Sequence, residues 1–375
     1  MTLRRKILSV VSMLLVLTVA CMAFALSYNS SCTAAEPLPE GTERMKAVVF
    51  RCYGSPEVLK VEDIARPAAG DNQVLVRVHA AAVNPVDWHG MRGSPYIMRL
   101  SSGLGAPKDT RIGVDFAGTV VAVGSSVTRF KPGDEVFGGR DGALAEYVTV
   151  RENGAIVLKP ANVTFAQAAA VGVAGITALQ GLRDKGHLQP GQKVLINGAS
   201  GGVGTFSVQV AKSLGAEVTG VCSTRNVDLV RSLGADRVID YTREDFAQSE
   251  ERYDLILDNV GNRSLTELRR AIKPDGTLVI VGAAKGDWIA PLANALKAVI
   301  LSHFVDQKLG MFIAQFNQPD LELLANLMRE GKVTPVVDRS YTLNETAAAM
   351  AYLEEGRARG KVVVSLESQS LSQRD

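Results

Sequence analysis

The sequence predicts an α/β protein that combines a doubly wound parallel sheet with a mostly antiparallel, barrel-like β domain. Short β-rich runs fill residues 45–164, and strands that alternate with helices follow them. A glycine-rich turn over residues 198–204 joins one of these strands to a helix. Alternating strands and helices indicate a parallel sheet covered on both faces, whereas successive short strands with turn signals indicate a small barrel. The 375 residues are enough for both domains.

The first 44 residues differ from the rest of the chain. Basic residues at positions 4–6 precede an apolar run over residues 7–26, and a polar stretch follows. This order is typical of an export signal, and a run of about 20 apolar residues could also stay as a membrane anchor. We expect an exported or anchored protein, on the periplasmic side if the source is bacterial, with membrane contact through residues 7–26. Whether the leader is cleaved stays open, and the alternative is a cytoplasmic protein whose true start is Met45.

Composition and charge argue against several classes of partner. The net charge is +2, from 41 basic and 39 acidic residues, so nothing favours binding to a nucleic acid. The four cysteines show no Cys-x-x-Cys pair and no histidine at ligand spacing, and therefore predict neither a disulfide framework nor a zinc site. They are Cys21, Cys32, Cys52 and Cys222.

The β-rich part is expected to hold six strands before residue 164. β-branched runs and Gly/Pro turns place five of them at about residues 46–50, 74–81, 113–124, 145–150 and 155–158, and a turn over residues 130–136 enters the other. A helix over Phe165–Leu182 then begins the second part, with Thr164 as its N-cap and Gln167 at the capping-box position.

The second part continues with strands expected at residues 193–197, 217–222, 237–239, 253–259 and 277–281, each separated from the next by helix or turn. Residues 288–305 are apolar but interrupted by polar side chains, which indicates a buried or interface helix. Residues 311–366, with helices over 320–331 and 343–356 and strands over 336–337 and 361–365, are expected to return to the first domain. Residues 367–375 form a polar tail.

The glycine-rich turn is the strongest functional motif. It follows the apolar strand at 193–197 and opens a helix, so backbone N–H groups can approach a pyrophosphate at the positive helix end. Gly201 allows that approach, Gly204 allows the helix to pack closely on the strand, and Ala199 stands where the first glycine of the usual motif lies. The expected binding residues in this turn are Ala199, Ser200, Gly201, Gly202, Val203 and Gly204.

The end of the next strand distinguishes NADP from NAD. An NAD site wants a carboxylate there for the ribose 2′-hydroxyl, but Cys222 is followed by Ser223, Thr224 and Arg225. Hydroxyls and a guanidinium suit a 2′-phosphate, so the sequence favours NADPH. The alternative is that Arg225 is simply a solvated loop residue.

With the turn, several motifs resemble the medium-chain dehydrogenase/reductase superfamily, and within it the zinc-free quinone oxidoreductase and enone reductase branch. They are NPVDW at 84–88, GVDFAG at 113–118, KPGDEVFG at 131–138, AGITA at 174–178, VIDY at 238–241 and GKVV at 360–363. The resemblance covers about residues 45–366. It implies a GroES-like catalytic domain over 45–164, an NADP-binding Rossmann domain over 165–310, a return to the catalytic domain over 311–366, and a homodimer.

The resemblance also implies the chemistry. Zinc-dependent relatives place Cys and His where this chain has Asn84 and Val114, so no bound metal is expected. The implied reaction is hydride transfer from NADPH to a small-molecule quinone or α,β-unsaturated carbonyl. Two rivals stay open, a catalytically weak NADPH-binding sensor or structural protein and a zinc alcohol dehydrogenase, and turnover and metal content would distinguish them.

Cofactor-contact roles follow from the resemblance. Asn84 is expected beside the nicotinamide, Thr177 near its ribose and Tyr241 at the adenosine end. The loop that begins at Asn259 is expected under the nicotinamide, and Lys361 near the cofactor cleft.

The expected catalytic residues are Asn84, Trp88 and His89. Asn84 would stabilise the oxyanion and Trp88 would form a wall of the pocket. His89 is a candidate proton donor beside water, and the alternative is a solvent-exposed loop imidazole. Asp115 is expected to be a buried carboxylate that caps local backbone, and residues 92–111 a flexible edge of the substrate pocket.

Overall fold

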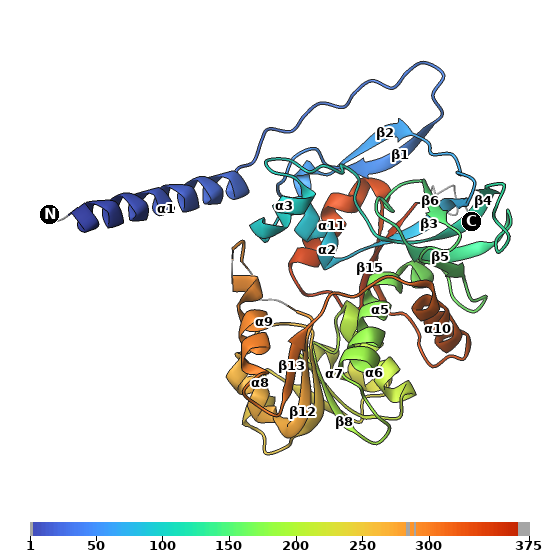
Figure 1. Cartoon of the computed structure of the whole chain (residues 1–375). Helices are drawn as coiled ribbons and strands as arrows, with labels where there is room; N and C mark the ends of the chain where they lie inside the picture. The colour runs from blue at the N-terminus through green and yellow to red at the C-terminus, as the bar shows by residue number, and fades with distance from the viewer. Residues whose placement is uncertain (1–2, 283–285, 289, 367–375) are drawn as a thin grey trace.

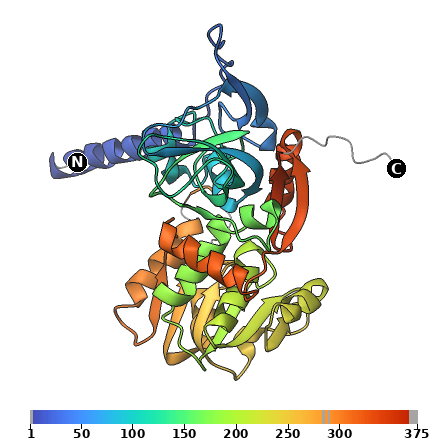
Figure 2. The same ribbon diagram turned by 90° about the vertical axis from the view of Figure 1, so that its right-hand side faces the viewer.

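Two sheets organise the computed structural model, which describes residues 3–282, 286–288 and 290–366. In both views the β-rich lobe lies above the lobe that holds the parallel sheet, and helix α1 (Leu3–Ser27) projects from the upper lobe (Figures 1 and 2). The predicted tail at 367–375 lies outside the described residues.

The lower lobe contains a six-stranded parallel sheet in the order β10-β9-β8-β11-β12-β13. Strand order reverses between β8 and its neighbours β9 and β11, and ligands of such sheets bind at the carboxyl ends of the strands at this switch point. The strands are β8 (Lys193–Asn197), β9 (Glu217–Cys222), β10 (Arg237–Asp240), β11 (Tyr253–Asp258), β12 (Ile272–Ile280) and β13 (Lys308–Met311). Its helices are α5 (Gly172–Gln180), α6 (Gly202–Ser213), α7 (Val227–Ser232), α8 (Leu265–Ala271) and α9 (Ala290–Leu301).

The upper lobe contains a seven-stranded sheet in the order β14-β15-β3-β4-β5-β7, with β6 also paired to β3. All pairs are antiparallel except β14 with β15. The strands are β3 (Gln73–Val83), β4 (Asp115–Val123), β5 (Glu135–Gly139), β6 (Tyr147–Arg151), β7 (Ile156–Leu158), β14 (Val337–Thr342) and β15 (Lys361–Ser365). A separate hairpin pairs β1 (Arg44–Val49) with β2 (Lys60–Ala65), and the helices are α2 (Pro85–Arg92), α3 (Arg99–Ser102), α4 (Phe165–Ala169), α10 (Gln318–Arg329) and α11 (Thr346–Glu354).

The fold class is as predicted, but the helix expected over 165–182 is two helices. Thr164 caps α4 with the predicted capping box to Gln167. The chain then restarts as α5 at Gly172, where a Cβ would lie 2.2 Å from an Asp115 carboxylate oxygen. That oxygen accepts a 2.8 Å hydrogen bond from the Val173 N–H, so the break lets Asp115 reach the start of α5.

Two further segments can be compared with their expectations. Residues 92–111, expected to form a flexible edge of the substrate pocket, contain α3 and a short 3-10 turn, and a 2.6 Å hydrogen bond from the Ser94 hydroxyl to Asp287 joins them to the other lobe. In the region 288–305 the predicted helix is present as α9, and because Leu296, Val299 and Ile300 are exposed, the interface alternative fits it and the buried alternative does not.

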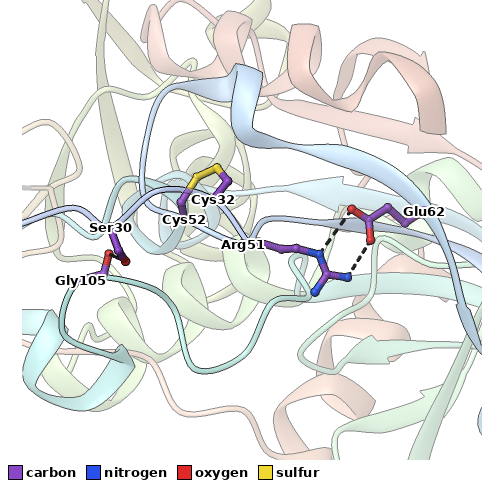
Figure 3. Close-up of a disulfide and its surroundings, with 6 residues drawn as sticks. All are labelled: Ser30, Cys32, Arg51, Cys52, Glu62 and Gly105. Carbon is purple, nitrogen blue, oxygen red and sulfur yellow. Dashed lines mark hydrogen bonds and ion pairs between the residues drawn. A yellow bond between two sulfur atoms is a disulfide. The ribbon is translucent and has the colours of Figure 1, made fainter. Parts of the chain in front are cut away.

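The cysteines correct the sequence analysis. Cys32, in the linker after α1, forms a disulfide with Cys52, which follows β1; their Cα atoms lie 4.6 Å apart (Figure 3). The sequence could not show this because the turn of the chain through β1 brings the two residues together. Cys21 and Cys222 are free.

Candidate functional site

The glycine-rich turn has the geometry expected for a dinucleotide. Gly198 has φ +78°, which favours glycine, and a Cβ at Gly204 would lie 2.0 Å from the Gly198 carbonyl oxygen. At Gly201 only that oxygen, 3.6 Å away, would meet a Cβ, so the space above the turn is open. The turn leads into the twelve-residue α6, whose first N–H groups have no partner within the helix.

The far end of this site carries hydroxyl, amide and guanidinium groups. Ser223 and Thr224 follow β9, and the Asn226 side chain donates to the Ser200 hydroxyl at 3.0 Å while its own carbonyl oxygen is buried without a partner. Arg225 is exposed and donates at 2.6 Å to the backbone carbonyl of Arg357. The structure thus adds Asn226 and Arg357 to the candidate residues at this end of the site. The sequence analysis missed Asn226 because a lone amide carries no motif, and Arg357 because it lies 132 positions from Arg225.

A carboxylate also lies near this end. Asp240, at the end of β10, accepts from the hydroxyls of Thr224 and Thr242 at 2.6 and 2.8 Å. Because these hydrogen bonds favour the charged form, the pKa of Asp240 lies below its usual value. Each Asp240 carboxylate oxygen therefore already accepts a hydrogen bond from a threonine hydroxyl. The neighbouring Tyr241 is exposed.

The opposite end of the turn carries an unsatisfied amide. Both side-chain polar atoms of Asn259, directly after β11, are buried without a hydrogen-bond partner. The preceding Asp258 is fixed, since it accepts from Asn197 at 2.8 Å and from the backbone of Val260. Because buried polar groups are normally paired, an open amide at the switch point is suited to a ligand.

A cluster of charged and polar groups is buried between the lobes. The Lys361 ammonium donates to the Asn84 side-chain oxygen and lies 3.4 Å from an Asp115 oxygen. Asn84 donates through its amide to Asp115 at 3.0 Å and to the Ala82 carbonyl at 3.2 Å. Lys361, Asn84 and Asp115 are at most 4% exposed, so a single cation is enclosed with one paired carboxylate.

Burial changes the ionisation of this cluster. It raises the pKa of Asp115, an effect that the Lys361 charge partly opposes. It also raises the pKa of Asp87 to about 7, and the charge of Asp115 adds to that rise. Asp87 accepts at 2.7 Å from the Asn84 N–H as part of the capping box of α2, so its charge is linked to the position of Asn84.

Trp88 and His89 lie on α2 and not on a loop. Their rings stack with centroids 3.7 Å apart, and the His89 side chain is partly buried. His89 Nδ1 lies 2.6 Å from the Ser94 carbonyl oxygen, which can only accept, so Nδ1 carries the proton and the neutral ring keeps a lone pair on Nε2. Burial lowers the His89 pKa, and the solvent-exposed alternative for His89 is wrong.

The remaining predicted residues frame the same region. Thr177 is buried on α5 and donates to the Val173 carbonyl at 2.6 Å. The turn and Lys361 are joined directly, because the Gly360 N–H donates to the Ser200 carbonyl at 2.9 Å. A Cβ at Gly202 would lie 3.1 Å from Cδ of Lys361. The structure therefore brings the turn, Asn84 and Lys361 together at the junction between the lobes.

The described residues contain no evident metal site. Within residues 3–282, 286–288 and 290–366, no group of three or more His, Cys, Asp or Glu side chains could hold a metal ion. At the two positions where the resemblance implies metal ligands in zinc-dependent relatives, this chain has Asn84, which accepts a hydrogen bond from Lys361, and Val114.

Comparisons with known proteins agree with this architecture. Residues 70–161 match the alcohol dehydrogenase GroES-like domain and residues 233–364 match the zinc-binding dehydrogenase family. The chain is 35% identical to a 2-methylene-furan-3-one reductase of Solanum lycopersicum, over 85% of this chain and 79% of that one. It is 36% identical to a chloroplastic NADPH-dependent alkenal/one oxidoreductase of Arabidopsis thaliana, over 86% and 80% of the two chains. The solved quinone oxidoreductase of Coxiella burnetii matches with a TM-score of 0.75 and 30% identity, over 87% of this chain and all of that one.

A doubly wound domain with a dinucleotide turn, joined to a GroES-like domain, defines a nicotinamide-dependent oxidoreductase. The chain belongs to the medium-chain dehydrogenase/reductase superfamily, as its motifs predicted.

Proposed function

We propose that this protein is an NADPH-dependent reductase that transfers hydride to a quinone or an α,β-unsaturated carbonyl without zinc. The observation that carries the proposal is the buried contact of Lys361 with Asn84 and Asp115. This contact puts a buried positive charge next to Asn84, the position where the resemblance implies a metal-binding cysteine in zinc-dependent relatives. Relatives named for reduction of alkenals, enones and quinones support the substrate class.

The residues around the glycine-rich turn suit the cofactor. The open turn at Gly201 and the helix end would hold the pyrophosphate, and Ser223, Thr224 and Arg225 would hold the 2′-phosphate. The unpartnered side-chain oxygen of Asn226 and the unpartnered amide of Asn259 lie at the two ends of the turn, where ribose and nicotinamide offer donors and acceptors. When bound, NADPH supplies the hydride.

The side chains of the chain itself prepare the electrostatics. The Lys361 ammonium is directed to three acceptors, the Asn84 side-chain oxygen, an Asp115 oxygen and the Val83 carbonyl. Lys361 would therefore stabilise the negative charge that develops on the substrate oxygen through its electrostatic field, which acts in a buried medium of low dielectric constant. Asn84 has both amide hydrogens engaged by Asp115 and Ala82, so in this arrangement it positions Lys361 and does not donate to the oxyanion. Neutral His89, with its free lone pair on Nε2, would pass a proton from solvent to the product.

We also propose that α1 places the enzyme outside the cytoplasm, as a homodimer anchored to a membrane. The 21 residues Ile7–Ser27 are long and apolar enough to cross a bilayer, and their most apolar 18-residue stretch is not buried against the protein. The Cys32–Cys52 disulfide supports an oxidising compartment.

An NADPH-oxidation assay with a panel of quinones and enones tests the reaction, with metal analysis of protein purified without chelator. We expect turnover that a chelator leaves unchanged, and zinc far below one per chain. Stoichiometric zinc with loss of activity in chelator would favour an alcohol dehydrogenase, and NADPH binding without turnover would favour a sensor. Cell fractionation with N-terminal sequencing tests the location.

A further inference from the structure

The end of α1 is built into the catalytic lobe. Leu26 is buried, and the Arg99 guanidinium donates to the carbonyls of Leu26 and Tyr28, at 3.0 Å in both cases. Arg99 is itself 1% exposed and also donates to the Gly93 carbonyl at 2.7 Å. Since a buried guanidinium without acceptors is strongly unfavourable, these carbonyls belong to the folded structure of the lobe.

The chain after α1 stays attached. Ser30 donates through its N–H and its hydroxyl to the Gly105 carbonyl, both at 2.9 Å, and the disulfide at Cys32 follows two residues later (Figure 3). No free linker therefore separates Ser27 from the lobe. At about 1.5 Å per residue, the 19 helical residues from Ile7 to Ala25 span about 28 Å, close to the thickness of a bilayer core.

Exposed apolar side chains gather around this attachment. We call them the exit face, which consists of Tyr28, Ile97, Leu100, Leu104 and Trp288, all at least 46% exposed. Trp288 packs edge-on against Tyr96, with ring centroids 4.9 Å apart, and Tyr96 lies under Arg99. Figure 1 shows α3 beside the C-terminal end of α1. Single exposed apolar residues need no explanation, but a group around the exit of an apolar helix indicates a partner.

We propose that the exit face rests on the surface of the bilayer that α1 crosses, with Leu100 and Leu104 inserted among the lipids and Trp288 at the headgroup level. The inference rests on the proposed anchor. It commits to lipid because the attachment at Arg99 holds this face at the membrane whenever α1 is embedded. The mixture of aliphatic and aromatic side chains suits the bilayer interface, and the exposed Lys108 on the same segment suits anionic headgroups.

The test uses the full-length protein in vesicles of phosphatidylcholine and phosphatidylglycerol with brominated acyl chains, which quench nearby tryptophan. The chain has two tryptophans, so the Trp288→Phe variant gives the contribution of Trp88 alone. We expect quenching of Trp288, and at least a twofold loss of that quenching in the Leu100→Ser/Leu104→Ser variant. The matched control, Leu158→Ser/Leu323→Ser, removes exposed leucines elsewhere and should leave quenching unchanged.

Alkaline carbonate extraction separates the two levels of the proposal. Release of the protein by carbonate, or a mature N-terminus beyond residue 27, overturns the anchor and this inference together. Retention with an unquenched Trp288 overturns the inference alone. Loss of a dimer, and not of quenching, in the Leu100→Ser/Leu104→Ser variant would assign the face to a second copy of the chain. Thermal midpoints of both double variants, which should match the parent, control for folding.

Discussion

Replacing Lys361 by methionine is the most direct test of the buried cluster. The change keeps the length of the side chain but leaves Asp115, which is fully buried, without its cation. Breaking a buried pair in this way costs about 3–5 kcal/mol of folding free energy. Burial already raises the Asp115 pKa, so the penalty should be smaller at about pH 5, where the carboxyl is more easily protonated, than at about pH 8.

A second substitution separates structure from chemistry. In the Lys361→Met/Asp115→Asn variant neither group is charged, and urea unfolding should recover to within about 1 kcal/mol of the parent. If Lys361 stabilises the developing oxyanion, kcat/KM for NADPH oxidation should stay about 100-fold or more below the parent. Recovery of activity together with stability would refute a chemical role for Lys361. Failure of Asp115→Asn to restore stability would refute the pairing itself.

Three other predictions concern single groups. The pKa of Asp87, about 7, lies above its value in the unfolded chain, so protonated Asp87 stabilises the fold at low pH and this stabilisation is lost as the pH rises through 7. The free energy of unfolding of the parent should therefore fall by about 2–3 kcal/mol between about pH 5 and 8. Equal urea midpoints for the parent and Asp87→Asn across that range would contradict this. Because the Arg225 guanidinium is proposed to bind the 2′-phosphate, Arg225→Ala should raise KM for NADPH at least tenfold and leave KM for NADH unchanged. The control Arg231→Ala on α7 should change neither KM, and an equal effect of Arg225→Ala on both cofactors would argue against a 2′-phosphate contact. The disulfide closes a loop with a sequence separation of 20, so Cys32→Ser should lower the free energy of unfolding by about 3 kcal/mol. The thermal midpoint should fall by a few degrees, and a reductant should not lower it further. Cys21→Ser, which removes a free thiol, is the control, and equal midpoints for Cys32→Ser and the parent would argue against the bond.

Local patterns predicted several strands with correct bounds. β8 and β9 of the parallel sheet and β15 of the upper-lobe sheet have the predicted bounds, because each is a short apolar run between turn residues. The capping box of Thr164 was visible because its two members are three residues apart. β13 was missed since Gly310 interrupts its run, and α2 was missed since Pro85 and Gly90 look like loop residues although proline suits a first helical turn.

The candidate site was only partly visible in the sequence. The glycine turn is contiguous, so its spacing carried the prediction. The contact of Lys361 with Asn84 joins residues 277 positions apart, and only pairing of β15 with β3 brings them together. A resemblance could place both residues near the cofactor, but it could not show that the Asn84 amide donates its hydrogen bonds to Asp115 and the Ala82 carbonyl.

The hydrogen bond from Gly360 to Ser200 bears on the order in which ligands arrive. It joins the pyrophosphate turn to the residue before Lys361, and Gly202 lies against the Lys361 stem. A dinucleotide bound at the turn would therefore contact the segment that is hydrogen-bonded to the backbone next to Lys361. We expect a compulsory sequence, with the dinucleotide entering first and the acceptor afterwards, and product inhibition patterns that distinguish the two steps.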